Sequence, residues 1–525
     1  MSTTSGTAPS MARSIEDARG KHSEPQRGLT SGPGAPFMLA RFGRLFPNMV
    51  AAQFGSTEEE NRANLNRLAM AMKADPDPPK DGPDEEESGI PALYTYFGQF
   101  VDHDITFDPA SSLQKQNDPD ALVDYRTPAL DLDNIYGRGP DDQPYLYGRG
   151  PVDPPDANAG KKFLLGKPLQ GGDAGARDLP RNSADPARAL IGDPRNDENA
   201  IVSQLQGLFL RFHNRTVDDN PGMKFEEVQQ RVRFHYQYVV LHDFLRRIVH
   251  SSVLDDLKTG GHYDRGKLRF FHWTNQPFMP VEFSVAAYRL GHSMVRPGYR
   301  LNDNDSTLLP IFRSSGNDLR GFQAMDAGRG IDWARFIDID IRAYDGSPAD
   351  DKRRLQFAYR IDTSLVNPLS DLPLVVVSTP PFALAERNLR RGWSLGLPSA
   401  QNVARAMGIK PLSDEKIWIG KAVKPQGKPR TSIVDVSKVF ADNCPLWTYI
   451  LAEAMHYQEK TPIPVQGTMS IDTPKLGPVG GRIVAEVLLG LLFADQSSLL
   501  NNPNCLPETG SDYALKDFVG YALHR

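Results

Sequence analysis

Gln99-Phe100-Val101-Asp102-His103-Asp104 brings an amide, an imidazole and two carboxylates together within two helical turns. The segment that leads into it, Tyr94-Thr95-Tyr96-Phe97-Gly98, is aromatic. At about 100° per residue on an α-helix, Gln99, Asp102 and His103 share one face, whereas Asp104 points about a quarter-turn away. An isolated Asp-His-Asp would favour a different interpretation, a capped helix end with solvated side chains. Three further clusters favour a functional site.

The composition favours small-molecule chemistry. The 525 residues are 39% hydrophobic, which is enough for a large buried core. Lys and Arg number 60 and Asp and Glu number 65, so the formal net charge is −5 and no electrostatic case exists for nucleic acid or an anionic membrane. The longest apolar stretch, residues 483–494, is too short for a transmembrane segment and is interrupted by Glu486.

The N-terminal residues differ in composition from the rest. Residues 1–35 are rich in Ser, Thr, Gly, Pro and charge and lack the apolar core of a secretory signal, so we predict that they are disordered. The missing signal indicates a cytoplasmic protein. Export by a route without a classical signal, which would give an extracellular location, stays open. Residues 36–525 are predicted to form one domain. Cys444 and Cys505 have no metal-type spacing, and they either pair or are buried thiols.

Helical periodicity and end signals predict a mainly α fold with long irregular loops and few short strands. The predicted helices include residues 56–73, 198–217, 225–249, 281–295, 399–407, 445–457 and 482–493. Residues 138–194 are rich in Pro, Asp and Gly and are predicted to be loop. The apolar run 374–377 is a short strand candidate in a loop-like setting. No internal repeat is visible, and no linker divides the middle of the chain.

Three further clusters contain residues capable of chemistry. Gly192-Asp193-Pro194-Arg195-Asn196-Asp197-Glu198-Asn199 places an arginine three residues before a glutamate, although a plain acidic helix start has the same composition. In Arg289-Leu290-Gly291-His292 a glycine directly precedes the histidine, which allows close approach to the backbone, although a lone histidine there is more often a packed residue. Asn388 and Arg391 supply an amide and a guanidinium one turn apart, an ordinary pairing when alone.

Together and in this order, the clusters resemble the animal haem peroxidase superfamily. Their four motifs have consistent spacing over about residues 90–405. The resemblance implies one mostly helical domain with haem b between helices, and reduction of hydrogen peroxide through an oxoferryl intermediate. The implied donors are small anions (iodide, bromide and thiocyanate rather than chloride) or aromatic compounds. Asn199 stands where some members have a methionine bonded to a haem vinyl group, so that link is not expected.

The resemblance also assigns roles around the iron. His103 matches the distal base, which moves a proton between the peroxide oxygens, and Arg195 matches the distal cation, which stabilises the departing hydroxide. Gln99 matches the residue that holds distal water. On the other face, His292 matches the proximal iron ligand. Its second ring nitrogen is expected to donate to Asn388, because metal-bound histidines generally have such a partner.

Four charged residues are expected at the haem edge. Arg289 and Arg391 match residues that meet the haem propionates, where a guanidinium fits a carboxylate. Asp102 and Glu198 match the carboxylates that form ester bonds to haem methyl groups in mammalian members. The resemblance therefore implies that haem is attached to the protein through one or both of these carboxylates.

A calcium site is also implied. The loop 127–133 has oxygen ligands at every second position, and it runs into Asn134-Ile135-Tyr136-Gly137 as the family's calcium loop runs into its own Tyr-Gly. Calcium takes six to eight oxygen ligands, and the candidates are Asp104, Thr127, the Ala129 carbonyl, Asp131 and Asp133. An extended loop with solvated acids is the alternative. Since Asp104 follows His103 directly, calcium would hold the distal base in position.

The sequence leaves two alternative functions. Fatty-acid dioxygenases of the same superfamily use a tyrosine three residues before the proximal histidine, where this chain has Arg289; Tyr288 is offset by about 100° on a helix. Those enzymes also commonly lack the ester-forming acids, so the peroxidase is ranked higher. A non-catalytic adhesive protein on the same scaffold is the other alternative, and the complete set of distal and proximal residues argues against it. The sequence does not specify an oligomeric state.

Overall fold

The structure is a computed structural model that describes residues 42–75, 84–106, 126–148, 158–503 and 512–525, except 275, 306, 341, 343–352, 378, 424–428 and 464–468. The predicted disordered residues 1–35 lie outside the described residues, and so does Cys505. Disorder of the N-terminus and pairing of the cysteines therefore stay predictions. Cys444 is fully buried.

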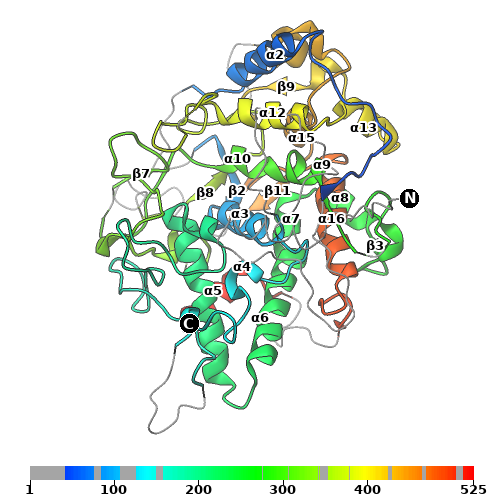
Figure 1. The fold of residues 1–525 in the computed structure, drawn as a ribbon. Helices are drawn as coiled ribbons and strands as arrows, with labels where there is room; N and C mark the ends of the chain where they lie inside the picture. The colour runs from blue at the N-terminus through cyan, green and yellow to red at the C-terminus, as the bar shows by residue number, and fades with distance from the viewer. Residues whose placement is uncertain are drawn as a thin grey trace, which may run out of the picture.

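The fold is mainly α-helical, as predicted (Figure 1). The α-helices of the described residues are α2 (Glu58–Ala71), α3 (Leu93–Ile105), α4 (Asp133–Tyr136), α5 (Ala200–Asp219), α6 (Phe225–Val239), α7 (Leu245–Ile248), α8 (Ser251–Asp256), α9 (Val281–Ser284), α10 (Gly291–Met294), α12 (Leu384–Ser394), α13 (Ala400–Ala406), α14 (Ile433–Val436), α15 (Leu446–Ala454), α16 (Gly480–Ala494) and α17 (Leu515–Ala522). Short 3-10 helices are η2 (Pro144–Leu146), η3 (Pro194–Asp197), η5 (Arg265–Lys267), η6 (Ala287–Leu290), η7 (Ala327–Arg329), η8 (Trp333–Arg335), η9 (Asp414–Lys416) and η10 (Lys438–Phe440). A π-helical turn, η4 (Val240–Phe244), joins α6 to α7. No helix in the described part of the chain is long and apolar enough to cross a membrane.

Strands are few and short, as predicted. They form six two-stranded sheets within the described residues. One pair is parallel, β1 (Phe42–Gly43) with β5 (Met279–Pro280). The antiparallel pairs are β2 (Glu87–Pro91) with β8 (Phe357–Tyr359), β3 (Lys258–Thr259) with β4 (His262–Tyr263), β6 (Gly298–Tyr299) with β7 (Leu309–Pro310), β9 (Trp418–Ile419) with β10 (Thr431–Ser432), and β11 (Gln458–Pro462) with β12 (Ser470–Pro474).

The strand candidate at residues 374–377 is a turn instead. The carbonyl of Pro373 accepts hydrogen bonds from the backbone N–H groups of Val376 (2.8 Å) and Val377 (3.1 Å). This local bonding satisfies groups that a strand would have paired with a neighbour. Leu374 is 71% exposed, so the run lacks the burial that stabilises an apolar strand.

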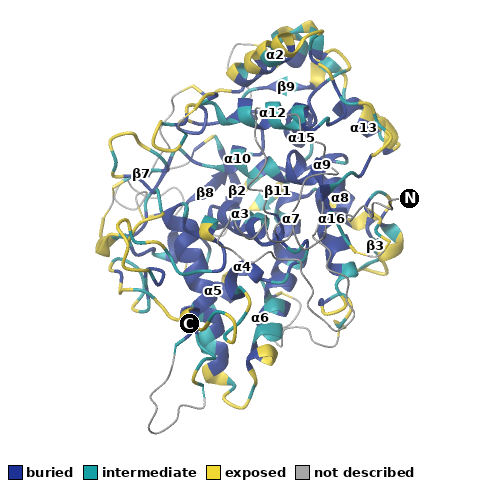
Figure 2. Cartoon of the chain, in the orientation of Figure 1, coloured by how far each residue is buried: buried dark blue, intermediate teal, exposed yellow. Residues whose placement is uncertain are grey.

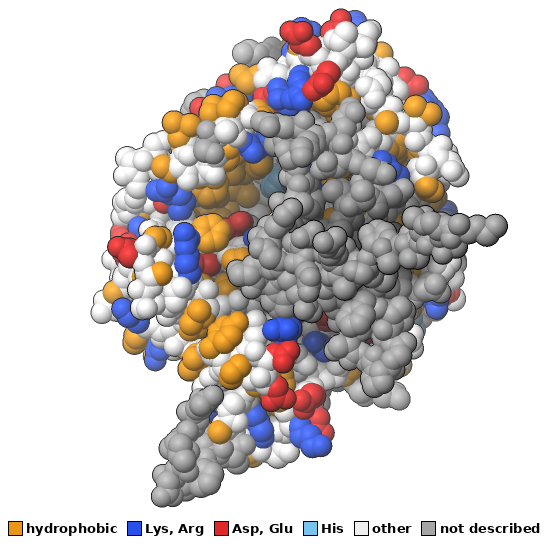
Figure 3. All heavy atoms as spheres, viewed as in Figure 1, with side chains coloured by type: hydrophobic (Ala, Val, Ile, Leu, Met, Phe, Trp, Pro, Cys, Tyr) orange, Lys and Arg blue, Asp and Glu red, His pale blue; other side chains and the backbone are white. Residues whose placement is uncertain are grey.

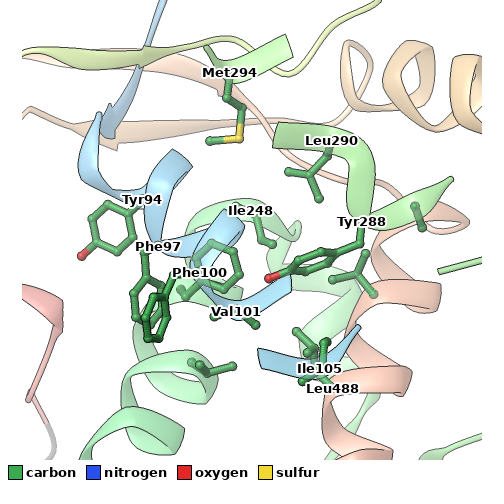
Figure 4. Packing of buried hydrophobic residues seen from close by; sticks show 14 of the residues in the cluster. Tyr94, Phe97, Phe100, Val101, Ile105, Ile248, Tyr288, Leu290, Met294 and Leu488 are labelled. Carbon is green, nitrogen blue, oxygen red and sulfur yellow. The ribbon is translucent and has the colours of Figure 1, made fainter. Parts of the chain in front are cut away.

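The helix α3 lies in the core of the molecule. Its apolar residues Phe97, Phe100, Val101 and Ile105 are fully buried. Figure 2 shows α3 among dark-blue elements, and Figure 4 shows Phe97 and Phe100 projecting from it into the packed interior. It packs against α5 and α10, so its polar residues face other elements rather than solvent.

Two long helices follow the predicted periodicity. At the start of α5, the Asn199 side chain accepts hydrogen bonds from the N–H groups of Ile201 and Val202, which caps the helix. The predicted helix 225–249 is α6, η4 and α7 in one nearly continuous run. The helices α6 and α17 both pack against α5, and α5 and α6 extend together below α3 in Figure 1.

The prediction of one helix over residues 281–295 is wrong. The segment forms α9, η6 and α10, and Ala286 has a non-helical conformation with φ −132° and ψ −75°. The buried Glu282 carboxylate accepts the backbone N–H groups of Leu45 (3.0 Å) and Phe46 (3.2 Å), and β5 just before it pairs with β1. These distant contacts position the first turn and override the local helical preference.

Candidate active site

A cavity of about 400 Å³ lies between α3 and the segment formed by η6 and α10. Its polar side chains come from both sides and include Gln99, Asp102, Glu198, Arg289 and His292. Its apolar wall contains Leu290, Met294, Val295, Ile311, Phe312, Leu369, Leu372, Val376, Val377 and Leu384. A mostly apolar cavity with a few convergent polar groups is typical of a small-molecule or cofactor site.

His103 is buried beside this cavity but is not among the residues that line it. Its Nδ1 lies 2.7 Å from Asn196 Oδ1. The Asn196 amide nitrogen donates to Gln206 Oε1 at 2.8 Å, which turns the Asn196 oxygen towards the histidine. His103 Nδ1 therefore donates and Nε2 keeps its lone pair. Burial and the nearby Arg195 lower the pKa of His103 to about 3, so the ring is neutral at neutral pH.

Arg195 lies next to His103, although its guanidinium does not line the cavity. Its NH2 group donates to the backbone carbonyls of His103 (3.0 Å) and Thr106 (2.6 Å) at the end of α3. It also donates to Asp193 Oδ2 at 2.9 Å. Arg195 therefore holds the C-terminal end of α3, where the last carbonyls lack helical partners.

Gln99, Asp102 and Glu198 form the α3 side of the cavity. The Gln99 amide nitrogen donates to Glu198, and its oxygen accepts from Asn199 at 3.3 Å. Burial raises the pKa of Glu198 to about 7 and also raises the pKa of Asp102, in each case against the opposing effect of Arg195. Asp102 accepts a hydrogen bond from Thr106 Oγ1 at 3.2 Å.

His292 faces the cavity from α10. Its Nδ1 lies 2.8 Å from the amide nitrogen of Asn388, and the Asn388 oxygen accepts from Arg289 NH1 at 2.9 Å. Because a guanidinium can only donate, Arg289 turns the Asn388 oxygen away from the histidine. The expected pairing of His292 with Asn388 is therefore present, but the amide donates to the ring rather than accepting from it.

The Arg289 guanidinium is a partly buried cation beside a second one, Arg391. Burial and the proximity of Arg391 lower the pKa of Arg289 to about 10, while Asp102 favours its charged form. Arg391 itself is not among the cavity-lining residues. Two neighbouring guanidiniums in a buried setting favour an anionic ligand between them.

Three predicted calcium ligands come together below α3. Carboxylate oxygens of Asp104, Asp131 and Asp133 all lie within 4.8 Å of one another. Asp104 is fully buried, and its Oδ1 has no hydrogen-bond partner in the described part of the chain. Burial and the two neighbouring carboxylates raise the pKa of Asp104 well above its usual range. Thr127 and Ala129 lie in the same loop as Asp131 and Asp133.

A buried ion-pair series connects this cluster to Arg195. Arg126, whose side chain is 1% exposed, donates to Asp133 at 3.0 Å and also binds Asp193. Although burial opposes it, Arg195 holds the pKa of Asp193 below its usual range, so the carboxylate stays charged. Sequence reasoning assigned no role to Arg126, Asp193 or Asn196. Asp193 and Asn196 lie inside the quoted Gly192–Asn199 motif. Their closeness to Arg195 in the sequence could therefore have indicated a role at the site.

The chain is similar in sequence and in fold to known proteins. The family model for animal haem peroxidases matches residues 110–320. The chain resembles thyroid peroxidase of Rattus norvegicus at 25% identity over 276 residues, which cover 50% of this chain and 28% of that protein. Its fold is similar to that of peroxidase A from Dictyostelium discoideum, with a TM-score of 0.59 at 16% identity over 95% of this chain and 96% of the other. These comparisons support membership of the animal haem peroxidase superfamily.

The same fold also occurs in the fatty acid alpha-dioxygenase of Arabidopsis thaliana, with a TM-score of 0.52 at 15% identity over 92% of this chain and 77% of that one. A dual oxidase of Drosophila melanogaster shares 28% identity over 124 residues, 22% of this chain and 7% of that protein. The curated relatives are thus much longer than the part that this chain matches. These similarities support the superfamily and show the fold, whereas the reaction depends on the residues of the site.

The residues around this cavity fit a haem group. An added Cβ at Gly291 would meet no atom within 4 Å, so the backbone beside His292 borders open space that a flat ring can approach. Among the described residues, the cavity-lining Thr95 Oγ1, Ser284 Oγ and Tyr288 hydroxyl are buried without hydrogen-bond partners. The paired guanidiniums suit propionates, and His292 offers a neutral imidazole, since burial and Arg289 lower its pKa to about 3.

The one-residue offset predicts that Tyr288 is a poor substitute for the dioxygenase tyrosine, and this stays a prediction. Tyr288 nevertheless lines the same cavity as His292, from η6 rather than α10. Figure 4 shows its ring projecting from η6 with the hydroxyl directed towards α3. The angular argument assumed a continuous α-helix, and the structure does not have one there.

Proposed function

We propose that this chain is a haem-dependent peroxidase that reduces hydrogen peroxide and oxidises small donors. The observation that carries the proposal is a pair of histidines associated with opposite sides of one cavity, the buried His103 on α3 and the partly buried His292 on α10. Each has its Nδ1 fixed by an asparagine side chain, Asn196 or Asn388. Superfamily membership supports the haem, and these fixed rings support the roles of base and ligand.

On the α3 side, His103 accepts the first proton of peroxide at Nε2, because Asn196 holds the proton on Nδ1. A histidine that is neutral at neutral pH is ready for this transfer, and the transiently charged ring is then the acid that returns the proton to the leaving oxygen. Arg195 supplies positive charge beside it and stabilises the negative charge that develops on that oxygen. To contact peroxide directly, the Arg195 guanidinium would give up one of its hydrogen bonds to the backbone carbonyls at the end of α3 and donate to peroxide instead.

On the α10 side, His292 Nε2 would hold the haem iron, while Arg289 and Arg391 would bind the propionates. Haem, when bound, supplies the redox centre that takes electrons from the donor. If Arg289 paired with a propionate, it would release the Asn388 oxygen, and the Asn388 amide could then turn to accept the Nδ1 proton of His292. Asn388 in this orientation keeps the ring neutral and oriented.

The proposed donors are iodide, bromide and thiocyanate, or aromatic compounds that give single electrons. Asn199 caps α5 and contacts Gln99, so this position provides no methionine link to a vinyl group. The missing link supports donors that are easier to oxidise than chloride. Gln99 would position water or a small anion next to His103.

Haem attachment through Asp102 and Glu198 is part of the proposal, since both carboxylates line the cavity. Glu198 is bonded to Gln99, so it would part from that amide before it bonds to a haem methyl group. After reconstitution and brief exposure to peroxide, we expect mass measurement under denaturing conditions to show protein with haem attached. The double variant Asp102→Asn, Glu198→Gln should release all of its haem. Complete release from the wild-type protein would contradict this prediction.

Calcium is proposed at Asp104, Asp131 and Asp133, with Thr127 and the Ala129 carbonyl as further ligands. The buried Asp104 oxygen without a partner supports a cation there, because three clustered carboxylates otherwise repel one another. Oxygen-rich clusters of this kind suit calcium.

A fatty-acid dioxygenase is the second candidate, and Tyr288 is the observation that favours it. Its buried hydroxyl has no partner among the described residues and lies in the wall of an apolar cavity. Asp102 and Glu198 in the same wall favour the peroxidase. Oxygen uptake with linoleate in the absence of peroxide, lost in Tyr288→Phe, would favour the dioxygenase instead.

The first test is haem binding. Purified protein supplied with haem should show a Soret band and oxidise iodide with hydrogen peroxide. His292→Ala should lose the band or shift it strongly, because the iron loses its protein ligand, whereas the exposed-site control His272→Ala should keep both properties. A wild-type protein with no Soret band would contradict the proposal and favour a non-catalytic, adhesive role for this scaffold.

A further inference from the structure

A second cavity, of about 560 Å³, lies between α5, α6 and α17. Aromatic rings from these elements line it, including Phe212, His235, Tyr513 and Tyr521. Tyr513 is 5% exposed, and its hydroxyl has no hydrogen-bond partner in the described part of the chain. A phenol that is buried against a cavity in this way can bond to a ligand within it.

Charged residues complete the lining of this second cavity. Arg231, Lys516 and Arg525 outnumber the acids Asp338 and Asp517. The Asp517 carboxylate accepts the Ala514 N–H at 2.8 Å, as the cap of α17. Arg525 pairs with Asp340 at 2.8 Å, and Lys516 lies 3.6 Å from Asp338. The cavity thus combines aromatic walls with charged side chains of both signs. On the face shown in Figure 3, acidic and basic side chains of the described residues are also interspersed.

A series of aromatic rings leads from the first cavity into the core. Tyr288 and Phe244, both in the wall of the first cavity, have ring centroids 6.5 Å apart. Phe244 lies 5.5 Å from Phe97, and Phe97 lies 6.1 Å from Tyr236. Figure 4 shows Phe97 on α3 and Tyr288 on η6 within this packed region. Tyr236 stands in the middle of the series, on α6.

The series continues from Tyr236 to the second cavity. The ring centroids are 6.0 Å apart for Tyr236 and Phe209 and 4.6 Å apart for Phe209 and Phe518. Phe518 stacks on Phe212 at 4.0 Å, and Phe212 lies 4.7 Å from Tyr521. Both Phe212 and Tyr521 line the second cavity. Each step therefore joins neighbouring rings, and the two ends lie in two different cavities.

The surroundings of Tyr521 favour oxidation that is coupled to loss of its hydroxyl proton. Its hydroxyl donates to Asp219 Oδ2 at 2.6 Å, so a carboxylate is in place to take the proton. The Arg215 guanidinium lies 4.2 Å from the ring centroid, which makes a positively charged ring unfavourable. Burial and Asp219 raise the pKa of Tyr521 to about 12, so the phenol keeps its proton until it is oxidised.

We propose that the second cavity binds an aromatic donor and that Tyr521 passes the donor's electrons along the ring series to haem. This inference rests on the proposed peroxidase function and names a donor class and a second site for it. Tyr521 loses one electron towards haem and its proton to Asp219, which leaves a neutral tyrosyl radical. The donor then gives one electron to that radical, and the proton returns from Asp219. Two such passes supply the two electrons that convert one hydrogen peroxide and two protons to two waters.

The decisive variant is Tyr521→Phe, which keeps the ring and removes the hydroxyl. Two probes are used with the haem-loaded protein: ABTS, a bulky aromatic disulfonate, and iodide, which enters the first cavity. We expect kcat/KM for ABTS to fall by about tenfold or more while iodide oxidation stays within about twofold of wild type. Phe212→Leu, which interrupts the series, should have the same selective effect. Tyr145→Phe, at a tyrosine that is 53% exposed, is the matched control.

Two further readouts do not depend on donor turnover. In peroxide-treated wild-type protein without a donor, spin trapping and peptide mapping should find an adduct on Tyr521. Calorimetry with ABTS and the 525-residue protein, before and after haem is supplied, should show binding that Lys516→Gln weakens several-fold. Unchanged ABTS oxidation in both Tyr521→Phe and Phe212→Leu would overturn the inference. If these proteins still oxidise iodide, the proposed peroxidase function is not contradicted. Failure of wild-type protein to oxidise either probe would overturn the peroxidase as well.

Discussion

Single residues in this site take their properties from neighbours that are distant in the sequence. Arg289 turns the amide of Asn388, 99 positions away, so that it donates to His292. The residue types and their order predicted which side chains would meet. The direction of that amide could not be predicted, because it depends on a third side chain, and the Gln99–Glu198 bond is a similar case. The roles of these residues in the reaction stay predictions.

Glu198 provides a test at the residue scale in the haem-free protein. Its folded-state pKa is raised from 4.5 to about 7 by burial, so between these values the folded protein holds a proton that the unfolded chain releases. The free energy of unfolding should therefore fall as pH rises from 4.5 to 7, and change little above that through this group. Glu198→Gln removes this contribution. Thermal unfolding at pH 5 and pH 8 should show a larger decrease for wild type than for the variant.

The exposed acid Glu226 offers the control, as Glu226→Gln should follow the wild-type pH dependence. Equal decreases in wild type and Glu198→Gln would show that the Glu198 carboxylate does not hold a proton in the folded state.

At the scale of elements, periodicity predicted the helices that pack along their length, such as α3, α5 and α6. It failed for residues 281–295, because Glu282 binds the backbone of residues 45 and 46 and so sets the first turn. It also missed α12, where charged residues interrupt the apolar pattern, and α17. After this break, η6 contributes Tyr288 and Arg289 to the cavity wall.

The end of α3 is the element that calcium is expected to stabilise. Asp104 and His103 are adjacent, and Arg126 and Asp193 connect Asp133 to Arg195. Chelation should therefore slow the reaction with peroxide and lower Tm, and added calcium should restore both. At free calcium about 100 times Kd the expected stabilisation is about 2.7 kcal/mol. Asp131→Asn should resemble the chelated protein, and Asp141→Asn, at an exposed acid, should not. Full activity and unchanged Tm in a calcium-free sample would rule out this role.

At the scale of the whole molecule, the helical class and the scarcity of strands were predicted from the sequence and are confirmed. The sequence also predicted a shared site for motifs that lie far apart, and the structure places Asp102, Glu198, Arg289 and His292 around one cavity. The second cavity could not be predicted, because its lining comes from α5, α6 and α17, and α17 was not recognised as a helix. Its aromatic residues look like ordinary core residues in the sequence.

The central claim is that His103 is the base that activates peroxide on the haem held by His292. Stopped-flow absorption of haem-loaded wild type and His103→Gln, mixed with hydrogen peroxide, tests it most directly. We predict an unchanged resting spectrum and a reaction slowed by about 10²–10⁴-fold, the usual contribution of a general acid–base residue. His272→Gln should react at the wild-type rate. A His103→Gln protein with an intact spectrum and a near-wild-type rate would contradict the account.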